Sequence, residues 1–338
     1  MQILRDAEIG MTAFVVVHST RLGPAFGGIR RWSYPDPGAG LADALRLAEH
    51  MTLKCAIHGV PGGGGKAVLL DCPELDRRRA YLRLGEFVQE MSGRFYTGPD
   101  VGTGADDLLT MGEVTDYVAL PDQRGPGELS EPTALGVFAG VRAVAKELDY
   151  STLEGVRVVV QGLGGVGWRL CDLLAKAGAE LSVCDVLADR VDAACVEWDA
   201  VAIAPEIAHT VDCDIYAPCA LGGVINSKTL PELGARAVAG SANNVLASAD
   251  CGVDLFRRGL LYAPDFVINS GGLVHGALFH LEGQAPPSTR IEEIGDRLTE
   301  IFSQSSVDDS PPEVLAREMA RQRLKQSSSN PFLPGRKQ

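Results

Sequence analysis

The segment VVVQGLGGVG, residues 158–167, joins an apolar run to three glycines in the pattern G-x-G-x-x-G. The run predicts a buried strand, and the helical spacing of apolar residues after Gly167 predicts a helix. The next apolar run ends in an acid, Asp185, which lies 23 residues after Gly162. Dinucleotide-binding folds place that acid at a spacing of about 20. Strand, glycine turn, helix and strand in this order predict a βαβ unit that binds a dinucleotide.

Each glycine of this pattern has a physical reason. Gly162 permits a tight turn, Gly164 lets the backbone approach a pyrophosphate, and Gly167 lets the helix pack closely on the strand. The pyrophosphate is expected at the start of the helix, beside Gly165 and Val166, where free N–H groups and the helix dipole favour anions.

Asp185 indicates which dinucleotide binds. Its carboxylate is expected to accept hydrogen bonds from the ribose hydroxyls and to repel a 2′-phosphate, which favours NAD over NADP. The alternative is a βαβ unit whose glycines serve packing alone. The complete context of strand, helix and acid favours the cofactor site.

The composition bounds the class of protein. A chain of 338 residues predicts two domains, and 46% hydrophobic with 22% charged residues is typical of a soluble globular protein. The net charge of −13 argues against nucleic acid or an anionic membrane surface as partner. The first ten residues do not resemble a secretory signal, and no apolar run reaches the roughly 18 residues of a membrane span. The sequence therefore predicts a cytoplasmic protein.

The eight cysteines include no C-x-x-C pair, and several lie in apolar helix or strand patterns. This usage predicts reduced thiols, with neither disulfides nor a metal site.

Strand-like and helix-like runs alternate over the first 128 residues. Strands are expected at 11–18 and 66–71, and helices at 41–57 and 81–92. A Pro- and Gly-rich segment at 120–136 reads as a linker or hinge. The chain as a whole is predicted to be an α/β protein in which the first domain precedes a Rossmann domain.

A second glycine-rich segment, HGVPGGGGKAVLL at residues 58–70, raises the question of a phosphate-binding loop. Gly65 before Lys66 fits a Walker-type loop, but Val60 and Ala67 stand where that loop needs its first glycine and its metal-binding hydroxyl. The letters KAVLL instead predict a buried strand. A lysine entering a buried strand needs a partner or a chemical task.

Two more charged residues of the first domain are candidates for chemistry. Lys54 lies on an amphipathic helix, and Asp100 lies in the Gly-rich loop YTGPDVGTGADD after a strand. Taken singly, each charge reads as a solvated surface group or a turn cap. Two lysines and one carboxylate that face a nicotinamide suit oxidation of an amino acid: one cation holds the carboxylate, and a base and an acid serve the nitrogen chemistry.

With these motifs the sequence resembles the Glu/Leu/Phe/Val amino acid dehydrogenase family on its leucine dehydrogenase side, with phenylalanine, valine and tryptophan dehydrogenases as relatives. The resemblance runs over nearly the whole chain and rests on LGPAFGGIRRW, DALRLAEHMTLKCAIHGVPGGGGKAVLL, GRFYTGPDVGT, VVVQGLGGVG, CDIYAPCALGG, GSANN and YAPDFVINSGGLV. It implies a mixed-sheet substrate domain at 1–128, a Rossmann domain at 129–311 and a cleft between them. A C-terminal helix, 312–338, is implied to return to the substrate domain.

The resemblance also implies an activity and partners. The reaction is reversible NAD-dependent oxidative deamination of an L-amino acid to the 2-oxo acid and ammonia. The partners are these small molecules and further copies of the chain, since family members are homo-oligomers.

Site residues follow from the matching motifs. Lys66 matches the catalytic lysine, Lys54 the lysine that binds the substrate carboxylate, and Asp100 the acid that handles protons on the substrate nitrogen. The glycines before Lys66 are expected to bend tightly and approach the substrate. The remaining positions that the resemblance implies line the substrate (Phe26, Gly27, Gly28, Met51, Gly276) or the cofactor (Thr133, Ala220, Asn243).

The resemblance implies that Lys66 acts as a base near neutral pH. Closure of the cleft excludes water, and the Lys54 cation nearby favours the neutral amine.

Departures from the family pattern mean that the sequence does not determine which substrate side chain is accepted. Ser270 replaces a usual Ala, His275 stands at a usual Asn, and Gly276 stands where leucine enzymes carry a Val. Gly276 enlarges the pocket, and Phe26 would fill space or stack on an aromatic ring. Branched aliphatic and aromatic substrates both remain possible. His275 reads as a helix-surface histidine with one hydrogen bond rather than as a second acid–base group.

Two alternatives to this activity are an enzyme of the shikimate or methylene-tetrahydrofolate dehydrogenase type, and an inactive NAD-binding homologue that acts as a sensor or assembly partner. The PDVGT and SANN motifs argue against the first. Retention of Lys54, Lys66 and Asp100 together argues against the second.

Overall fold

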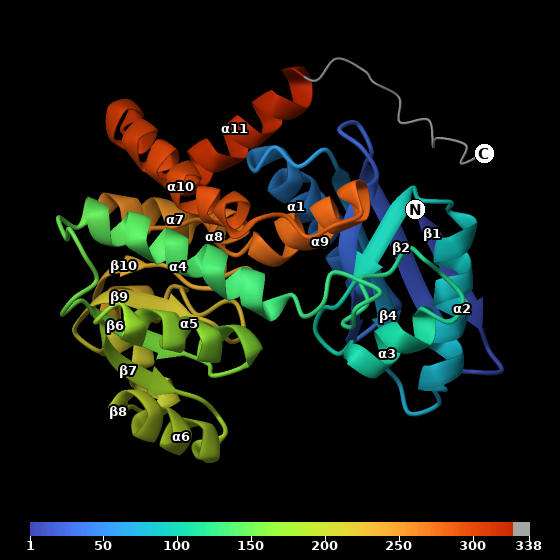
Figure 1. The fold of residues 1–338 in the computed structure, drawn as a ribbon, viewed down its shortest axis with the longest axis horizontal. Coiled ribbons are helices and arrows are strands. Elements are labelled where there is room, and N and C mark those ends of the chain that lie inside the picture. The colour runs from blue at the N-terminus through green and yellow to red at the C-terminus, as the bar shows by residue number, and fades with distance from the viewer. Residues whose placement is uncertain (327–338) are drawn as a thin grey trace. The chain divides into compact units, whose positions relative to one another are not determined.

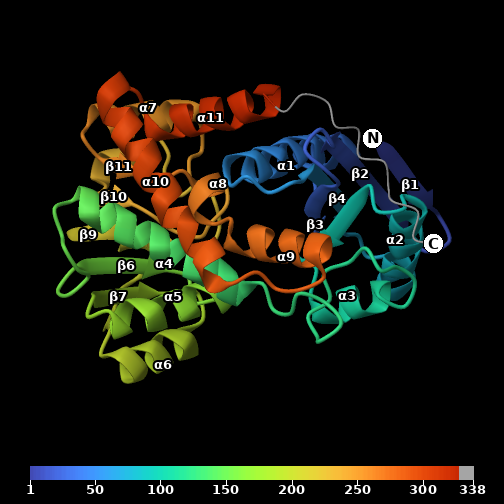
Figure 2. The same ribbon diagram turned by 45° about the horizontal axis from the view of Figure 1, so that its top comes forward.

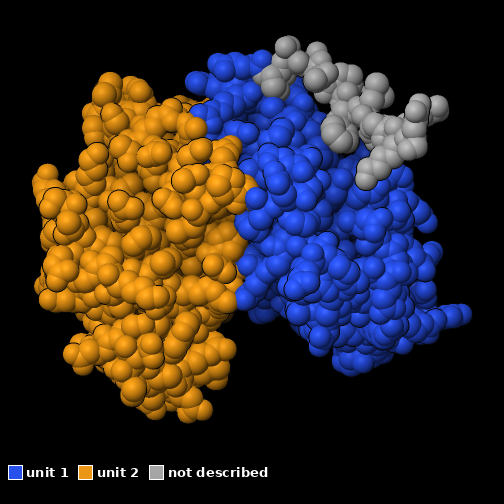
Figure 3. Space-filling model, in the orientation of Figure 1, with its two compact units in different colours: residues 1–129, 273–285, 320–338 blue, residues 130–272, 286–319 orange. Residues whose placement is uncertain are grey.

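The computed structural model describes residues 1–326 and divides them into two units (Figure 3). Unit 1 contains residues 1–129, 273–285 and the described residues from 320 onward, and unit 2 contains 130–272 and 286–319. The predicted helix at 312–338 is described as far as residue 326, and its last part lies outside the described residues.

Unit 1 is built on a five-stranded mixed sheet in the order β1-β2-β4-β3-β5 (Figure 1). The pairs β1–β2 and β2–β4 are antiparallel, whereas β3 pairs in parallel with both β4 and β5. The prediction of a mixed sheet is confirmed. The strands are β1 (Gln2–Asp6), β2 (Met11–Ser19), β3 (Ala25–Trp32), β4 (Gly63–Leu70) and β5 (Phe95–Gly98).

Helices cover both faces of this sheet. Helix α1 (Pro37–Ile57) packs mainly against β2 and β4 on one face. It begins where the Asp36 carboxylate accepts the Ala39 N–H, and Pro37 follows at the first helical position. Helices α2 (Arg77–Glu90) and α3 (Ala105–Met111) cover the opposite face.

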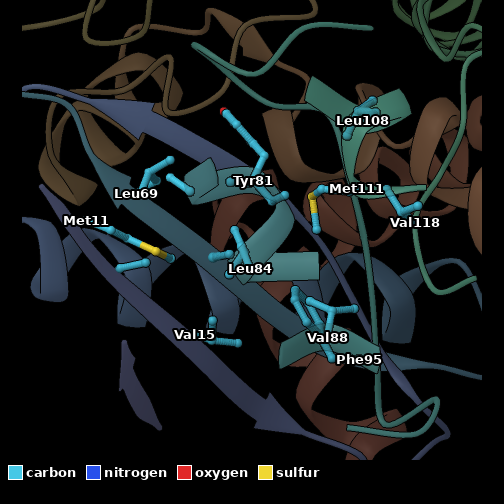
Figure 4. Close-up of a cluster of buried hydrophobic side chains, with 14 of the residues drawn as sticks. Met11, Val15, Leu69, Tyr81, Leu84, Val88, Phe95, Leu108, Met111 and Val118 are labelled. Atoms are coloured by element: carbon cyan, nitrogen blue, oxygen red, sulfur yellow. The ribbon is translucent and has the colours of Figure 1, made fainter. Parts of the chain in front are cut away.

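The larger core of unit 1 lies between the sheet and α2 and α3 (Figure 4). Strand side chains that alternate toward this face meet the apolar sides of the two helices. On the α1 side, a smaller cluster joins β2 and β4 to the helix. The larger core includes Met11, Val15, Leu69, Tyr81, Leu84, Val88, Phe95, Leu108, Met111 and Val118.

Unit 2 contains a six-stranded, wholly parallel sheet in the order β11-β10-β9-β6-β7-β8 (Figure 2). This is the doubly wound order of dinucleotide-binding folds, in which the winding direction reverses between β6 and β9. The strands are β6 (Arg157–Gln161), β7 (Glu180–Cys184), β8 (Val201–Ala202), β9 (Cys213–Pro218), β10 (Ala235–Val238) and β11 (Leu261–Tyr262).

Two helices of unit 2 pack closely through small residues. A Cβ added at Gly136 of α4 would lie 2.7 Å from Ile294 Cδ1, and one at Gly295 of α10 would lie 2.8 Å from the Ala139 carbonyl oxygen. Glycine therefore lets α4 and α10 approach each other. The helices of unit 2 are α4 (Ser130–Glu147), α5 (Gly165–Lys176), α6 (Ala188–Trp198), α7 (Ala249–Arg257), α8 (Asp265–Ile268) and α10 (Ser288–Asp308), with 3₁₀ turns η1 (Pro205–Thr210) and η2 (Leu230–Glu232).

Two helices pass from unit 2 into unit 1 along their length. Helix α9 (Gly271–Glu282) enters unit 1 at residue 273, and α11 (Pro312–Gln326) enters it at residue 320. Each unit is therefore assembled from separate segments of the chain.

Two expected boundaries were wrong. Strand β4 begins at Gly63, three residues before the predicted start, so that glycines of the GGGG run belong to the strand. The expected linker at 120–136 ends early because α4 begins at Ser130. Pro132 lies in the first turn of this helix, where the missing N–H costs no hydrogen bond.

Within residues 1–326, no helix is both long and apolar enough to cross a membrane. All eight cysteines lie in this part of the chain as free thiols.

Candidate active site

A lysine of one strand and an aspartate that follows another strand form an ion pair on the α1 side of the sheet in unit 1. The Lys66 ammonium lies 2.7 Å from Asp100 Oδ2, and both side chains are buried. Lys66 belongs to β4 and Asp100 follows β5, with β3 between them. The two side chains meet near Gly28 of β3, where an added Cβ would lie 2.4 Å from the Pro99 carbonyl oxygen and 3.0 Å from Asp100 Cβ.

Arg30 is a third member of this cluster, although no sequence pattern singles it out. Its Nε donates to Asp100 Oδ2 at 3.0 Å, and its Nη1 donates to Asp43 of α1 at 3.0 Å. Arg30 lies two residues beyond Gly28, so that alternation places both on the same face of β3. The motif GGIRRW contains this arginine, but only the strand register reveals its partners.

The charge state of Asp100 follows from these contacts. Burial raises the pKa of the carboxyl, but the Lys66 and Arg30 charges and the Lys66 hydrogen bond outweigh it and lower the pKa to about 2. Asp100 is therefore an anion near neutral pH, and it accepts protons or hydrogen bonds in this state.

The glycines before Lys66 differ from expectation. They form no tight bend, since none of residues 62–65 has a positive φ. Gly63, Gly64 and Gly65 lie in extended β4, where an added Cβ would come within 1.8 Å of the Ser19 carbonyl oxygen, 2.1 Å of the Thr52 nitrogen and 2.7 Å of the Phe95 ring, respectively. The glycines are thus required for close packing of β4 against its neighbours on both faces. This packing fixes the strand that carries Lys66.

Helix α1 contributes two predicted residues. Lys54 lies in its last turn and is 9% exposed. Met51 lies one turn earlier, and its Cγ would be 3.4 Å from a Cβ added at Gly27. That Cβ would also lie 1.8 Å from the Gly65 carbonyl oxygen, so that only glycine fits at Gly27. Both residues thus belong to the helix that packs on the sheet face carrying Lys66.

Helix α9 brings Gly276 and His275 into unit 1. The nearest atoms to a Cβ added at Gly276 are those of the Leu129 side chain at 3.7 Å, so that a small side chain would fit there. The His275 ring makes a 3.0 Å hydrogen-bonding contact with the Pro126 carbonyl oxygen.

Phe26 is buried and stacks on Tyr96, with ring centroids 5.2 Å apart. Tyr96 does not stand out in the sequence, since a single aromatic in a strand is usually a core residue.

In unit 2 the glycine loop has the backbone geometry expected of a dinucleotide-binding turn. Gly162 has a φ of +102°, which favours glycine. A Cβ at Gly167 would lie 1.9 Å from the Gly162 carbonyl oxygen, whereas one at Gly164 would meet nothing within 4 Å. Gly165 and Val166 begin α5, so that their N–H groups belong to the helix N-terminus.

This loop lies where the winding of the sheet reverses. Gly162 follows β6, and Ala220 follows the adjacent β9. A Cβ added at Gly162 would lie 2.8 Å from that of Ala220, so that the two segments are neighbours. Doubly wound folds bind their ligands at this point.

The acid at the end of β7 orders the same loop. Asp185 Oδ2 accepts the Leu163 N–H at 2.6 Å, and Oδ1 accepts the Leu187 N–H at 2.9 Å. A carboxylate offers about four lone-pair sites, so that ribose hydroxyls can also bind to it. The Arg190 guanidinium lies 3.9 Å from Oδ2.

The remaining predicted cofactor residues lie in two segments. Thr133 belongs to the first turn of α4. Asn243 accepts a 2.9 Å hydrogen bond from Asn269 Nδ2, which also donates to the carbonyl oxygens of Ser241 and Ala242. The buried amide of Asn269 thus positions the SANN segment. Sequence reasoning assigned it no role, although it lies in the motif VINSGG.

A buried lysine–aspartate pair and a doubly wound dinucleotide fold define the class of nicotinamide-dinucleotide-dependent dehydrogenases. Residues 3–118 match the model for "Glu/Leu/Phe/Val dehydrogenase, dimerisation domain", and residues 127–188 and 188–311 match that for "Glutamate/Leucine/Phenylalanine/Valine dehydrogenase". The chain belongs to the Glu/Leu/Phe/Val dehydrogenase family and is an amino acid dehydrogenase. The resemblance seen in the sequence is confirmed.

Individual relatives cover nearly the whole chain. Leucine dehydrogenase of Geobacillus stearothermophilus is 41% identical over 97% of this chain and 92% of its own length. Phenylalanine dehydrogenase of Lysinibacillus sphaericus is 39% identical over 90% and 82%, respectively. The crystal structure of L-tryptophan dehydrogenase from Nostoc punctiforme matches with a TM-score of 0.81 and 36% identity, over 97% of this chain and 96% of that one.

Proposed function

We propose that this enzyme uses NAD⁺ to deaminate an L-amino acid with an apolar side chain, either branched or aromatic, to the 2-oxo acid and ammonia. The observation that carries the proposal is the buried Lys66–Asp100 ion pair, which lies beside Gly28 of β3. The relatives named for leucine, phenylalanine and tryptophan support an apolar substrate side chain.

Lys54 binds the substrate carboxylate in this proposal, and the other two charges act on the nitrogen. A cation at Lys54 fixes the substrate Cα, which lowers the entropic part of the barrier. The dinucleotide, when bound, accepts the hydride that leaves Cα. The Lys66 ammonium first loses a proton to solvent, and the neutral amine then takes a proton from the water that attacks the resulting iminium carbon.

The charge state of Asp100 refines the proton route. A carboxylate that is already ionised cannot supply the first proton to the departing nitrogen. We infer that the proton taken up by Lys66 passes across the 2.7 Å contact to Asp100 and then to the amine nitrogen of the carbinolamine. As the C–N bond breaks and ammonia leaves, Lys66, neutral again, takes the hydroxyl proton, so that Lys66 is once more a cation and Asp100 an anion.

NAD⁺ is proposed over NADP⁺ because of Asp185. Its carboxylate lies at the end of β7 and would repel a 2′-phosphate while it accepts hydrogen bonds from the ribose. A homo-oligomer is proposed because residues 3–118 match a dimerisation domain.

The test is NADH formation with a panel of L-amino acids, by wild type and by the variants Lys66→Ala and Lys228→Ala. Lys66→Ala is expected to lower kcat by about 10²–10⁴-fold, which is the usual contribution of an acid–base group, and to leave NADH affinity unchanged. Lys228 is exposed in unit 2 and serves as the matched control. Retained turnover in Lys66→Ala would overturn the assignment. If the wild type bound NADH and oxidised no amino acid, the sensor alternative would be favoured.

A further inference from the structure

Three rings form a continuous row in unit 1. Phe26 of β3 pairs in register with Tyr96 of β5, and their rings stack at 25°. The Tyr96 ring also contacts that of His280 on α9, with centroids 4.8 Å apart. The row therefore joins the sheet to the helix that carries Gly276.

This row leads directly to the catalytic pair. Gly28 follows Phe26 by two residues, and Gly98 follows Tyr96 by two. The two glycines are therefore paired on the same face of the sheet as the rings. Two residues further, Asp100 takes part in the ion pair with Lys66. Two residues of strand span about 6.6 Å, so that a substrate whose nitrogen is held near Asp100 can direct a long side chain along the strands towards the rings.

His280 lies at the helix end of this row with an unused polar atom. Its Nε2 is buried and makes no hydrogen bond within residues 1–326. Such atoms are uncommon in native structures because burial without a partner is costly. His280 follows Gly276 by four residues, which places both on the same face of α9.

The histidine is neutral under working conditions. Burial lowers the pKa of His280 to about 4. A neutral imidazole can accept a hydrogen bond at one ring nitrogen, whereas an imidazolium cannot. Along the strands, the charged pair of Lys66 and Asp100 lies beyond the paired glycines Gly28 and Gly98.

We propose that His280 is a specificity-determining residue that accepts, at Nε2, a hydrogen bond from an N–H or O–H donor on the ring of an aromatic substrate. Phe26 and Tyr96 supply the apolar surface against which that ring packs. The substrate class is therefore aromatic amino acids that carry a ring donor, an indole N–H above all. This inference rests on the proposed function and narrows its substrate.

The experiment compares pairs of substrates that differ in the donor. Tryptophan is compared with 3-benzothienylalanine, in which sulfur replaces the indole N–H, and tyrosine is compared with phenylalanine. Leucine is the substrate without a ring. Values of kcat/KM are measured for wild type, His280→Leu, His280→Gln and the control His275→Leu, which changes a histidine of the same helix.

Wild type is expected to prefer tryptophan over its sulfur analogue by about tenfold or more, because the analogue leaves Nε2 without a partner. His280→Leu should reduce this ratio to near unity while leucine turnover persists. His280→Gln, which keeps an acceptor, should restore part of the ratio, and His275→Leu should leave it unchanged.

Equal use of both members of each pair by wild type would overturn the inference. So would a His280→Leu variant that loses activity on leucine and on both ring substrates in equal proportion. In either case, turnover of leucine or phenylalanine would leave the proposed function standing. If wild type oxidised no amino acid, both would be overturned.

Discussion

Arg30 connects the candidate active site to helix α1, since one guanidinium bonds both Asp100 and Asp43. We predict that Arg30→Gln raises the pKa of Asp100, because one of the two cations that offset its burial is removed. The acid limb of the kcat/KM profile should then move to higher pH. Arg31→Gln is the control, because Arg31 bonds Asp71 instead. If the acid limb of the kcat/KM profile lay at the same pH in wild type and Arg30→Gln, the role of the Asp100 anion would be contradicted.

Asp185 is predicted to set the cofactor preference. Asp185→Ser removes the charge that repels a 2′-phosphate and leaves Arg190 nearby to bind it. The ratio of kcat/KM for NADP⁺ to that for NAD⁺ should rise by about tenfold or more, as one removed charge–charge repulsion near the surface allows. Steady-state kinetics with both cofactors measure the ratio. Adding Arg190→Ala should lower it again, and an unchanged ratio in Asp185→Ser would disprove the assignment.

At the level of elements, the turn between β6 and α5 offers two glycines with opposite surroundings. A Cβ at Gly167 would collide with the Gly162 carbonyl oxygen, whereas one at Gly164 meets open space. Gly167→Ala is therefore expected to lower the free energy of unfolding by about 1–3 kcal/mol, as overpacking does. Gly164→Ala should keep the wild-type Tm but weaken NADH binding. Thermal melts and NADH titration separate the two effects, and identical behaviour of both variants would contradict this division.

Helix α11 carries a buried carboxylate near its start. Glu313 Oε1 accepts a 2.7 Å hydrogen bond from Arg317, while Oε2 has no partner within residues 1–326. Burial raises the pKa of Glu313 to about 7, against the attraction of Arg317, and the Asp265 anion adds to the increase.

The sign of the resulting pH dependence follows from linkage. Between the ordinary pKa of 4.5 and about 7, the folded chain holds a proton at Glu313 that the unfolded chain has lost. Stability from this group is complete below 4.5 and is lost as pH rises to about 7, by an amount on the order of 1–3 kcal/mol.

Glu313→Gln is predicted to remove this loss, because its side chain stays neutral. Denaturant unfolding across that pH window measures the free energy of unfolding of both proteins. As pH rises, the value for Glu313→Gln should increase relative to that for wild type. Glu318→Gln, an exposed change on the same helix, should track wild type. A constant difference between Glu313→Gln and wild type would exclude this titration.

Secondary-structure elements could be predicted from the sequence where all local signals indicate the same element. The β6–α5–β7 unit was predictable because an apolar run, spaced glycines and a terminal acid all agree. The start of β4 was not, because Gly63 to Gly65 give no alternation of apolar and polar residues, and glycine clusters usually mark turns. These positions require glycine because of tertiary packing: atoms of neighbouring segments occupy the space that a side chain would need.

The candidate site was predictable to a similar extent. Lys66 and Asp100 stood out as charges beside glycine-rich strands and were supported by the family resemblance. Arg30 and His280 were not identified, because their partners lie far away in sequence. Arg30 bonds a residue 70 positions later, and His280 meets Tyr96 only because α9 returns to unit 1.

For the whole molecule, the division into units predicts which fragments fold. Residues 130–272 contain the parallel sheet but lack α10, whose Ile294 and Leu298 pack against the glycines of α4. We expect the fragment 130–319 to unfold in one cooperative thermal transition and the fragment 130–272 to bind a hydrophobic dye and lack such a transition. Circular dichroism and calorimetry test this. A cooperative 130–272 fragment would show that α10 is dispensable.

The route of α9 into unit 1 also has a consequence for the timing of biosynthesis. The ribosome finishes residue 129 long before it adds residues 273–285, which complete the same unit. At translation speeds of 5–20 residues per second, the delay is roughly 7–30 s. During that interval the nascent mixed sheet presents Tyr96 without its neighbour His280. Chaperones that recognise exposed aromatic surface on a stalled or slow nascent chain have this interval in which to act.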